Sequence, residues 1–204
     1  NPGMRSLTLD IEHPDTIRDF ATRVSAQFPD LNVLLNNAGI MQPENWTADT
    51  VDLSAAEATL TTNLLGPLRL TAALLPLLKQ QRKSTIVTVT SGLAFTPLAL
   101  TPTYCATKAA IHSWTQTLRH QLRETSVEVL ELVPPYVQTE LMGERQATDP
   151  NAMPLADFIA EAIPLFSSPP PSGELLVKRV DPLRWAERDG AFTEVFTRLN
   201  SMAH

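Results

Sequence analysis

The feature that most constrains the fold is a regular alternation of short apolar segments with longer helical patterns. The apolar segments are rich in Val, Ile, Leu and Thr, whereas the intervening segments place apolar residues three or four positions apart. Strands that alternate with helices pair in parallel, with helices on both faces of the sheet. We therefore predict an α/β fold with a doubly wound parallel sheet in three α/β/α layers. The predicted strands are 5–11, 31–37, 84–91, 127–133 and 173–177, and the predicted helices are 14–28, 54–81, 103–124 and 189–200.

Two regions depart from simple alternation. The helical stretch 54–81 is expected to consist of two pieces that meet near Asn63. Residues 134–172 are rich in proline and lack clean periodicity, so we expect a loop and a short helix there, with 140–172 covering a substrate. No internal repeat or linker is evident, and 1–204 is predicted to be a single domain.

Composition argues against several classes of partner and site. A net charge of −6 and a pI of about 5.2 disfavour a nucleic acid or an anionic membrane as partner, and no apolar run approaches the length of a membrane span. A single cysteine, Cys105, excludes an internal disulfide and favours a reducing, cytoplasmic location. The histidines are scattered and no metal site is predicted; His112 and His120 are expected to be exposed helix residues. The four histidines are His13, His112, His120 and His204.

Unusual polar and turn-forming residues gather where the predicted strands end. In an open parallel sheet, ligands bind beyond the carboxyl ends of the strands. The strand ends therefore predict a binding site along one rim of the sheet. The residues at these ends are Asp10-Ile11, Asn36-Asn37-Ala38-Gly39, Ser91-Gly92 and Pro134-Pro135.

Tyr104 and Lys108 lie four residues apart in the predicted helix 103–124. This spacing places a phenol and an ammonium group on the same helix face. A Tyr-x-x-x-Lys pattern alone is more often a packed tyrosine beside a solvated lysine, so its interpretation depends on the rest of the chain.

Five stretches supply that context, because LLNNAG, NLLGP, VTVTSG, YCATK and PPYVQT occur in this order. Their order and spacing resemble the short-chain dehydrogenase/reductase family over roughly residues 1–142. Ser91 precedes Tyr104 by thirteen residues and Asn63 lies in an N-x-x-G stretch, as the catalytic serine and asparagine of that family do. The resemblance implies a Rossmann-type fold, NAD or NADP as cofactor, a small alcohol or carbonyl substrate, and a homodimer or homotetramer.

The resemblance also implies a role for each of four catalytic residues. Tyr104 is the general acid and base that exchanges a proton with the substrate oxygen. Because free tyrosine has a pKa near 10, Lys108 is expected to lower the pKa of this phenol and to hold the nicotinamide ribose. Ser91 is expected to donate a hydrogen bond to the substrate oxygen, and Asn63 to anchor a water molecule in a proton relay to Lys108.

The cofactor contacts implied by the resemblance follow the strand ends. Pro135 stands where the family usually has glycine, and a proline fixes φ at about −65° and removes an amide donor on the nicotinamide side. The adenine is assigned to Asp10 and Ile11, the adenosine ribose to Asn37, Ala38 and Gly39, and the nicotinamide end to Tyr104, Lys108, Pro134, Val137 and Thr139.

Three further residues lie next to these motifs. Cys105 replaces what is usually a serine in the family, and we interpret it as a small buried side chain rather than a nucleophile. Met41 and Trp46 follow the N-N-A-G turn, where contact with substrate and packing in the core are equally compatible with the sequence.

The glycine-rich turn that opens this family does not occur in the sequence, which starts where the third strand of the family starts. We therefore expect a fold that lacks the first two strands, in a sequence that is part of a longer protein. Segment 5–11 is then left without a neighbouring strand, and 31–37 becomes an exposed apolar edge. The segment that selects between NAD and NADP is also absent.

The leading hypothesis is an NAD(P)-dependent oxidoreductase that interconverts an alcohol and a carbonyl compound. One alternative is a non-catalytic member that binds a dinucleotide or a protein partner. Another is an epimerase or dehydratase of the extended branch, which shares the Tyr-x-x-x-Lys pattern. The substrate is set by 140–172 and the C-terminal tail, where the resemblance is poorest.

Overall fold

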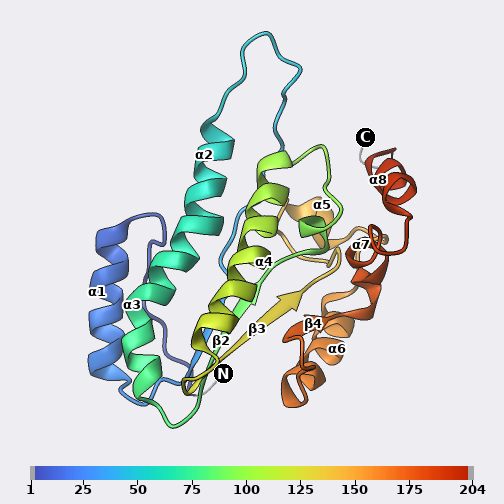
Figure 1. Ribbon diagram of the computed structural model, residues 1–204. Coiled ribbons are helices and arrows are strands. Elements are labelled where there is room, and N and C mark those ends of the chain that lie inside the picture. Colours follow the sequence, from blue (N-terminus) through green and yellow to red (C-terminus); the bar gives the residue numbers. More distant parts are fainter. Residues whose placement is uncertain (1–2, 202–204) are drawn as a thin grey trace.

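The computed structural model describes residues 3–201 and contains a parallel sheet flanked by helices (Figure 1). The strands are β1 (Val33–Asn36), β2 (Ser84–Val89), β3 (Val127–Val133) and β4 (Glu174–Leu176), and they pair in that order. The predicted α/β fold with a parallel sheet is confirmed. His204, one of the four histidines of the sequence, lies outside the described residues.

The helices follow the predicted periodicity. The longer helices are α1 (Pro14–Gln27), α2 (Ser54–Leu60), α3 (Gly66–Gln80), α4 (Pro102–Leu122), α6 (Leu155–Ser167) and α8 (Phe192–Ser201). The short helical segments are η1 (Thr61–Leu65), η2 (Gly92–Ala94), α5 (Glu144–Ala147), η3 (Lys178–Val180) and α7 (Asp181–Arg184).

Both faces of the sheet are covered, which gives the three predicted layers. Successive residues of a strand point to opposite faces. In β2, Ile86 packs into a core with α1, α3 and α4, whereas Val87 packs into a second core with α6. In β3, Val129 and Leu130 divide between the same two cores. Figure 1 shows α1, α3 and α4 arranged across one face of the strands.

The predicted break in 54–81 is confirmed as a π-helical turn, η1, between α2 and α3. Pro67 lies in the first turn of α3 and has no amide hydrogen to donate to the carbonyl group of Asn63, four residues earlier. The regular helical ladder is therefore interrupted at Asn63. Single π turns of this kind often occur at functional sites.

The prediction of a strand at 5–11 is wrong. This segment pairs with no described strand, and its apolar residues Leu7, Leu9 and Ile11 pack partly buried against the core under α1 and α3. Apolar alternation predicted the extended, half-buried chain correctly, but a strand also needs a hydrogen-bonding neighbour.

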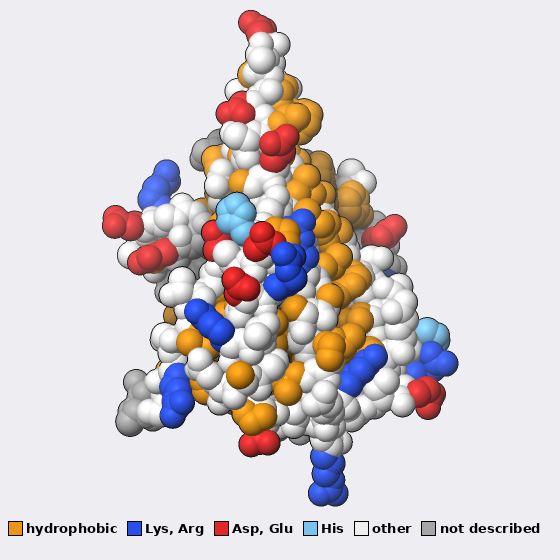
Figure 2. Space-filling view, turned by 90° about the vertical axis from the view of Figure 1, so that its left-hand side faces the viewer, with side chains coloured by type: hydrophobic (Ala, Val, Ile, Leu, Met, Phe, Trp, Pro, Cys, Tyr) orange, Lys and Arg blue, Asp and Glu red, His pale blue; other side chains and the backbone are white. Residues whose placement is uncertain are grey.

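The expected exposed edge is present at β1, the outermost strand of the sheet. Val33 and Leu35 are 53% and 51% exposed, because no described element covers their side of the strand. Between β1 and α2, residues 37–53 form a long loop that projects from the body of the molecule in Figure 1. The view in Figure 2 shows the same projection above a surface on which apolar and charged side chains are interspersed.

The C-terminal region is more helical than expected. The predicted loop 140–172 contains the whole of both α5 and α6. Just before it, Val137 forms an isolated parallel bridge with Met153. β4 is shorter than the predicted 173–177, and α8 begins three residues later than the predicted 189. Within residues 3–201, no helix combines the length and the apolar character needed to cross a bilayer.

Candidate active site

A large open cleft lies along the carboxyl ends of the strands, with a volume of about 1560 Å³. The parallel strands deliver their C-terminal residues to the same rim, as expected for this type of sheet. Nine of the predicted site residues line the cleft. They are Asn37, Ala38, Gly39, Ser91, Tyr104, Lys108, Pro134, Val137 and Thr139.

Tyr104 and Lys108 lie side by side in the first turns of α4, both buried. The Nζ atom of Lys108 lies 5.5 Å from the centre of the Tyr104 ring and donates a 2.8 Å hydrogen bond to the carbonyl oxygen of Val89. Lys108 thereby ties α4 to the end of β2. The phenol and the ammonium meet at one wall of the cleft, as their spacing predicted.

Burial controls the proton affinities of both groups. It raises the pKa of Tyr104 to about 12, because the phenolate loses solvation, while the Ser91 hydroxyl acts in the opposite direction. Burial also lowers the pKa of Lys108 to about 8. The pKa of Tyr104 is thus raised rather than lowered, and desolvation is the largest cause. The lowering expected from Lys108 stays a prediction.

The surroundings of Lys108 fit a nicotinamide ribose. An ammonium group has three N–H donors. Among residues 3–201, its acceptor is the Val89 carbonyl, which leaves donors for a ligand in the cleft that the side chain lines. Two neighbouring hydroxyl groups of a ribose are acceptors of the required kind.

Ser91 follows β2 and begins the short helix η2. Its side-chain oxygen accepts a hydrogen bond of 3.1 Å from the backbone nitrogen of Leu93. Ser91 is therefore a cap, and the same hydroxyl influences the pKa of Tyr104. Ser91 and Tyr104 both line the cleft.

Asn63 lies in η1, behind the lining of the cleft, and is 2% exposed. Its Nδ2 atom donates to the carbonyl oxygen of Ile40 and its Oδ1 atom accepts from the backbone nitrogen of Ile40, both at 2.8 Å. A Cβ atom on Gly39 would lie 3.3 Å from this Oδ1 and 3.9 Å from the Nζ of Lys108. The glycine allows the N-N-A-G loop to lie against both side chains.

The structure does not bring Asp10 and Ile11 into the cleft lining. The Asp10 carboxylate accepts a hydrogen bond from the backbone nitrogen of Glu12, while Ile11 packs against Gly66 at the start of α3. Asp10 thus belongs to the turn before α1, and Ile11 to the packing against α3. Their assignment to an adenine has no support in this geometry.

Two residues that the sequence did not single out shape the site. Gln146, in α5, is buried and donates from Nε2 to the carbonyl oxygen of Val137 at 2.8 Å and to Oγ1 of Thr139 at 3.1 Å. Glu44 accepts hydrogen bonds from the backbone nitrogen and the hydroxyl of Thr103 at 2.9 and 2.8 Å. Glu44 thus caps the start of α4 in place of Thr101, whose side chain forms no cap.

Cys105, Met41 and Trp46 have three different environments. Cys105 is 4% exposed, as expected for a small buried side chain. Met41 lines the cleft, whereas Trp46 is 56% exposed on the projecting loop and donates to Glu44. Trp46 therefore belongs neither to the core nor to the cleft lining.

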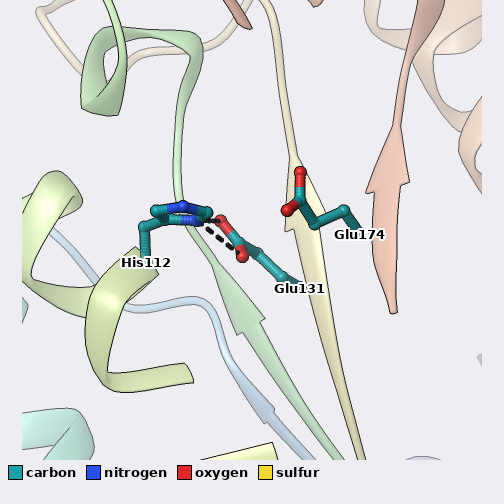
Figure 3. Close-up of side chains that lie close together, drawn as sticks. All are labelled: His112, Glu131 and Glu174. Carbon is teal, nitrogen blue, oxygen red and sulfur yellow. Dashed lines mark hydrogen bonds and ion pairs between the residues drawn. The ribbon is translucent and has the colours of Figure 1, made fainter. Parts of the chain in front are cut away.

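The expectation that His112 is an exposed helix residue is wrong. Its side chain is 17% exposed, and its Nδ1 atom lies 2.9 Å from both carboxylate oxygens of Glu131 (Figure 3). Helical periodicity alone could not show this contact, because Glu131 belongs to a strand nineteen residues further along the chain.

Comparison with known proteins identifies the family. A family model for short chain dehydrogenases matches residues 2–150. The chain belongs to the short-chain dehydrogenase family. Short-chain dehydrogenases are oxidoreductases that use NAD or NADP, which gives the cofactor class of the family.

Two curated members of the short-chain dehydrogenase family illustrate the relationship. The uncharacterized oxidoreductase DltE of Bacillus subtilis (strain 168) is 40% identical over 178 residues, which cover 86% of this chain and 69% of that protein. The NADP-dependent 3-hydroxy acid dehydrogenase of Schizosaccharomyces pombe is 31% identical over 166 residues, covering 77% of this chain and 64% of that one. This chain thus spans about two thirds of the length of these relatives.

Solved structures of short-chain dehydrogenases share the fold. A short chain dehydrogenase from Burkholderia cenocepacia J2315, in complex with NADP, superimposes with a TM-score of 0.80 at 24% identity. The match covers 97% of this chain and 81% of that one. At this level of identity, the similarity establishes the three-layer Rossmann-type fold.

Proposed function

We propose that this chain carries the active site of an oxidoreductase that interconverts an alcohol and a carbonyl compound with NAD or NADP. The observation that carries the proposal is the buried pair of Tyr104 and Lys108 beside Ser91 on the cleft wall. Burying ionisable groups costs stability, and such groups in a cleft are candidates for catalysis. A member that only binds a dinucleotide has no need of this phenol.

The cleft would hold a nicotinamide that, when bound, would supply or accept a hydride at the substrate carbon. In the reducing direction, the Tyr104 hydroxyl donates a proton to the substrate oxygen, and in the oxidising direction it takes the proton back. With a pKa of about 12, the phenol is protonated at neutral pH and ready to donate. Ser91 donates a hydrogen bond to the same oxygen and fixes its direction.

Lys108 holds the ribose and, as an ammonium, favours the phenolate that proton donation leaves on Tyr104. We assign the proton relay to a water molecule held at Asn63. The support is that the Asn63 amide and the Lys108 ammonium both lie against Gly39. The backbone carbonyl of Asn63 receives no hydrogen bond from Pro67, which has no amide hydrogen, and is an acceptor for that water.

The wall next to Ser91 and Tyr104 supports a substrate with an apolar group. It includes Leu93 and Leu98 from the segment after β2 and Leu183 and Leu199 from the C-terminal region. We therefore propose carbonyl compounds with an apolar chain. Each additional buried CH₂ contributes about 0.8 kcal/mol, so KM should fall about fourfold for each carbon added to a methyl ketone. A flat series would remove this substrate class.

The decisive experiment measures oxidation of NADH and NADPH by the full-length protein with a panel of ketones and aldehydes. Tyr104→Phe should lower kcat by about a hundredfold or more while leaving the Kd of the cofactor nearly unchanged. Tyr136→Phe, which removes the other tyrosine, should retain measurable turnover. A wild-type protein that binds NADP and reduces no carbonyl would instead favour the non-catalytic alternative.

The assembly and location of the protein are part of the same proposal. Leu53, Leu60 and Leu65, on and beside α2, are 40–47% exposed and support a homodimer or homotetramer. Light scattering after size-exclusion chromatography tests this, since a monomeric mass would contradict it. The single thiol supports a cytoplasmic location, which cell fractionation tests.

A further inference from the structure

A fully buried carboxylate lies beneath the end of β2. Glu131 is 0% exposed on β3 and faces the helix layer, opposite Glu174 of β4 in the sheet register. Figure 3 shows both carboxylates and His112 gathered at one point. A buried charge of this kind requires partners, and the proposed proton transfer at Tyr104 does not use it.

The arrangement of partners argues against a metal site. His112, Glu131 and Glu174 could each offer one ligand atom within 4.8 Å of the others. Glu174, however, binds Arg184 through both oxygens, at 2.8 and 3.1 Å. Glu131 accepts from Thr90 at 2.7 Å and contacts His112 at 2.9 Å. The oxygens already have partners, and the Arg184 guanidinium would repel a second cation.

The partners of Glu131 belong to the two elements that carry the proposed catalytic residues. Tyr104, Lys108 and His112 follow at intervals of four residues along one face of α4. The first two contact the end of β2, and His112 contacts Glu131 of β3. Lys108 donates to the Val89 carbonyl, and Tyr104 lies near the Ser91 hydroxyl.

Thr90, which lies between Val89 and Ser91 in the sequence, is joined to His112 through Glu131. The Thr90 hydroxyl donates to Oε1 of Glu131, while Nδ1 of His112 contacts Oε1 and Oε2. The ring of His112 also packs edge-on against Phe95, 4.7 Å away, in the segment that follows Ser91. The Glu131 carboxylate therefore joins the end of β2 to α4, and the contact between His112 and Phe95 joins the segment after Ser91 to the same helix.

We propose that His112 and Glu131 are positioning residues. They fix the position of Ser91, at the end of β2, relative to Tyr104 in α4. Glu131 acts through Thr90, the residue before Ser91, and His112 acts through α4. This inference rests on the proposed function for its catalytic consequence. It goes beyond that function because neither residue touches the cleft.

A carboxylate suits this task better than an apolar side chain. Its two oxygens accept from two directions at once, and charge-assisted hydrogen bonds are short and directional. An apolar contact would cover the same surface and permit sliding of the strand end along the helix. Misplacement of a reacting group by about 1 Å costs about a hundredfold in rate.

The test compares Glu131→Gln with Glu128→Gln, which makes the same change on the same strand at a half-exposed carboxylate paired with Lys83. For the folded protein, Glu131→Gln should lower kcat by between about 10 and 100-fold with little change in KM. The double variant H112Q/E131Q replaces the pair by two amides that can bond each other. It should recover part of the lost kcat. Equal kcat for the E131Q and E128Q variants would overturn the proposal.

A second readout does not depend on turnover. The sequence has two tyrosines, so the ring signals of ¹³C-labelled Tyr104 can be assigned by NMR with Tyr104→Phe. Glu131→Gln should shift these signals and Glu128→Gln should not. If the wild type reduces no carbonyl, the proposed function fails, and the NMR comparison alone decides this inference. Unchanged Tyr104 signals would contradict it.

Thermal unfolding with added Zn²⁺ tests the alternative that the cluster binds a metal. Addition of Zn²⁺ to the wild type should leave Tm unchanged. A rise in Tm that His112→Gln abolishes would assign the cluster to a metal and overturn the positioning role.

Discussion

The side-chain amide of Asn63 pairs with the backbone of Ile40 through two hydrogen bonds of 2.8 Å, one in each direction. This pairing joins the π turn between α2 and α3 to the loop that follows β1. Neither element is regular secondary structure, so the side chain replaces the backbone ladder that a sheet or helix would supply. The position of Ile40, directly after the N-N-A-G stretch, therefore depends in part on Asn63.

Removal of the amide tests this dependence. Asn63→Ala leaves both backbone groups of Ile40 without their partner and should lower the free energy of unfolding by about 1–3 kcal/mol. Asn63→Asp keeps the acceptor for the Ile40 nitrogen but places a carboxylate oxygen against the Ile40 carbonyl. We expect it to be no more stable than the alanine variant. Urea unfolding measures both, and a stable Asn63→Asp would show that the donor to Ile40 is dispensable.

Burial of Lys108 predicts a specific dependence of stability on pH. Its pKa is about 8 in the folded protein and near 10.5 in the unfolded chain. Between these values the unfolded state binds more protons, so this residue makes stability increase as pH rises from 8 to 10.5. The cost of burying the charged form is fully present below pH 8.

Lys108→Met should therefore be more stable than the wild type at pH 7, and the difference should narrow as pH rises toward 10. Each pKa unit corresponds to about 1.4 kcal/mol. Urea unfolding at several pH values measures the difference. Exposed Lys79→Met is the control, and a pH-independent difference for Lys108→Met would contradict the assigned burial.

The contact between Gly66 and Ile11 predicts how segment 5–11 is held. A Cβ atom on Gly66 would lie 2.7 Å from Cγ1 of Ile11 and 3.1 Å from its carbonyl oxygen. Gly66→Ala should displace the segment and increase amide exchange over residues 5–11, as hydrogen exchange with mass spectrometry can measure. Leu65→Ala, which shortens an exposed neighbour, should leave this exchange unchanged.

The cap supplied by Glu44 predicts a loss of stability at the start of α4. Glu44→Ala removes the acceptor for the Thr103 amide and should cost about 0.5–2 kcal/mol. Glu57→Ala, in α2, is a matched change at an exposed position. Equal unfolding midpoints for the two variants would show that α4 does not depend on Glu44.

Local patterns predicted the elements that depend on short-range chemistry. The helix behind Pro14, the break at Asn63 and the shared face of Tyr104 and Lys108 follow from spacing and from proline, and the structure has all three. The strand at 5–11 failed because strand formation is a property of pairs of segments. Alternation fixes which side chains face inward but cannot supply a neighbour.

The contacts that place the site were beyond the sequence for a different reason. Glu44 caps a helix 59 residues away, and Gln146 reaches back to Val137 from a short helix without periodicity. The raised pKa of Tyr104 was not predicted because the depth of burial, its largest cause, is not visible in a sequence.

The single thiol of Cys105 lies directly after Tyr104, held by the backbone nitrogen of Leu98 at 3.3 Å and almost inaccessible to solvent. Burial also raises its pKa, so the closed state offers reagents very little thiolate. Alkylation must therefore wait for the first turn of α4 to separate from the segment before it. The alkylation rate of the Cys105 sulfur, measured by mass spectrometry, therefore reports how often the structure opens locally next to Tyr104, and it needs no introduced probe.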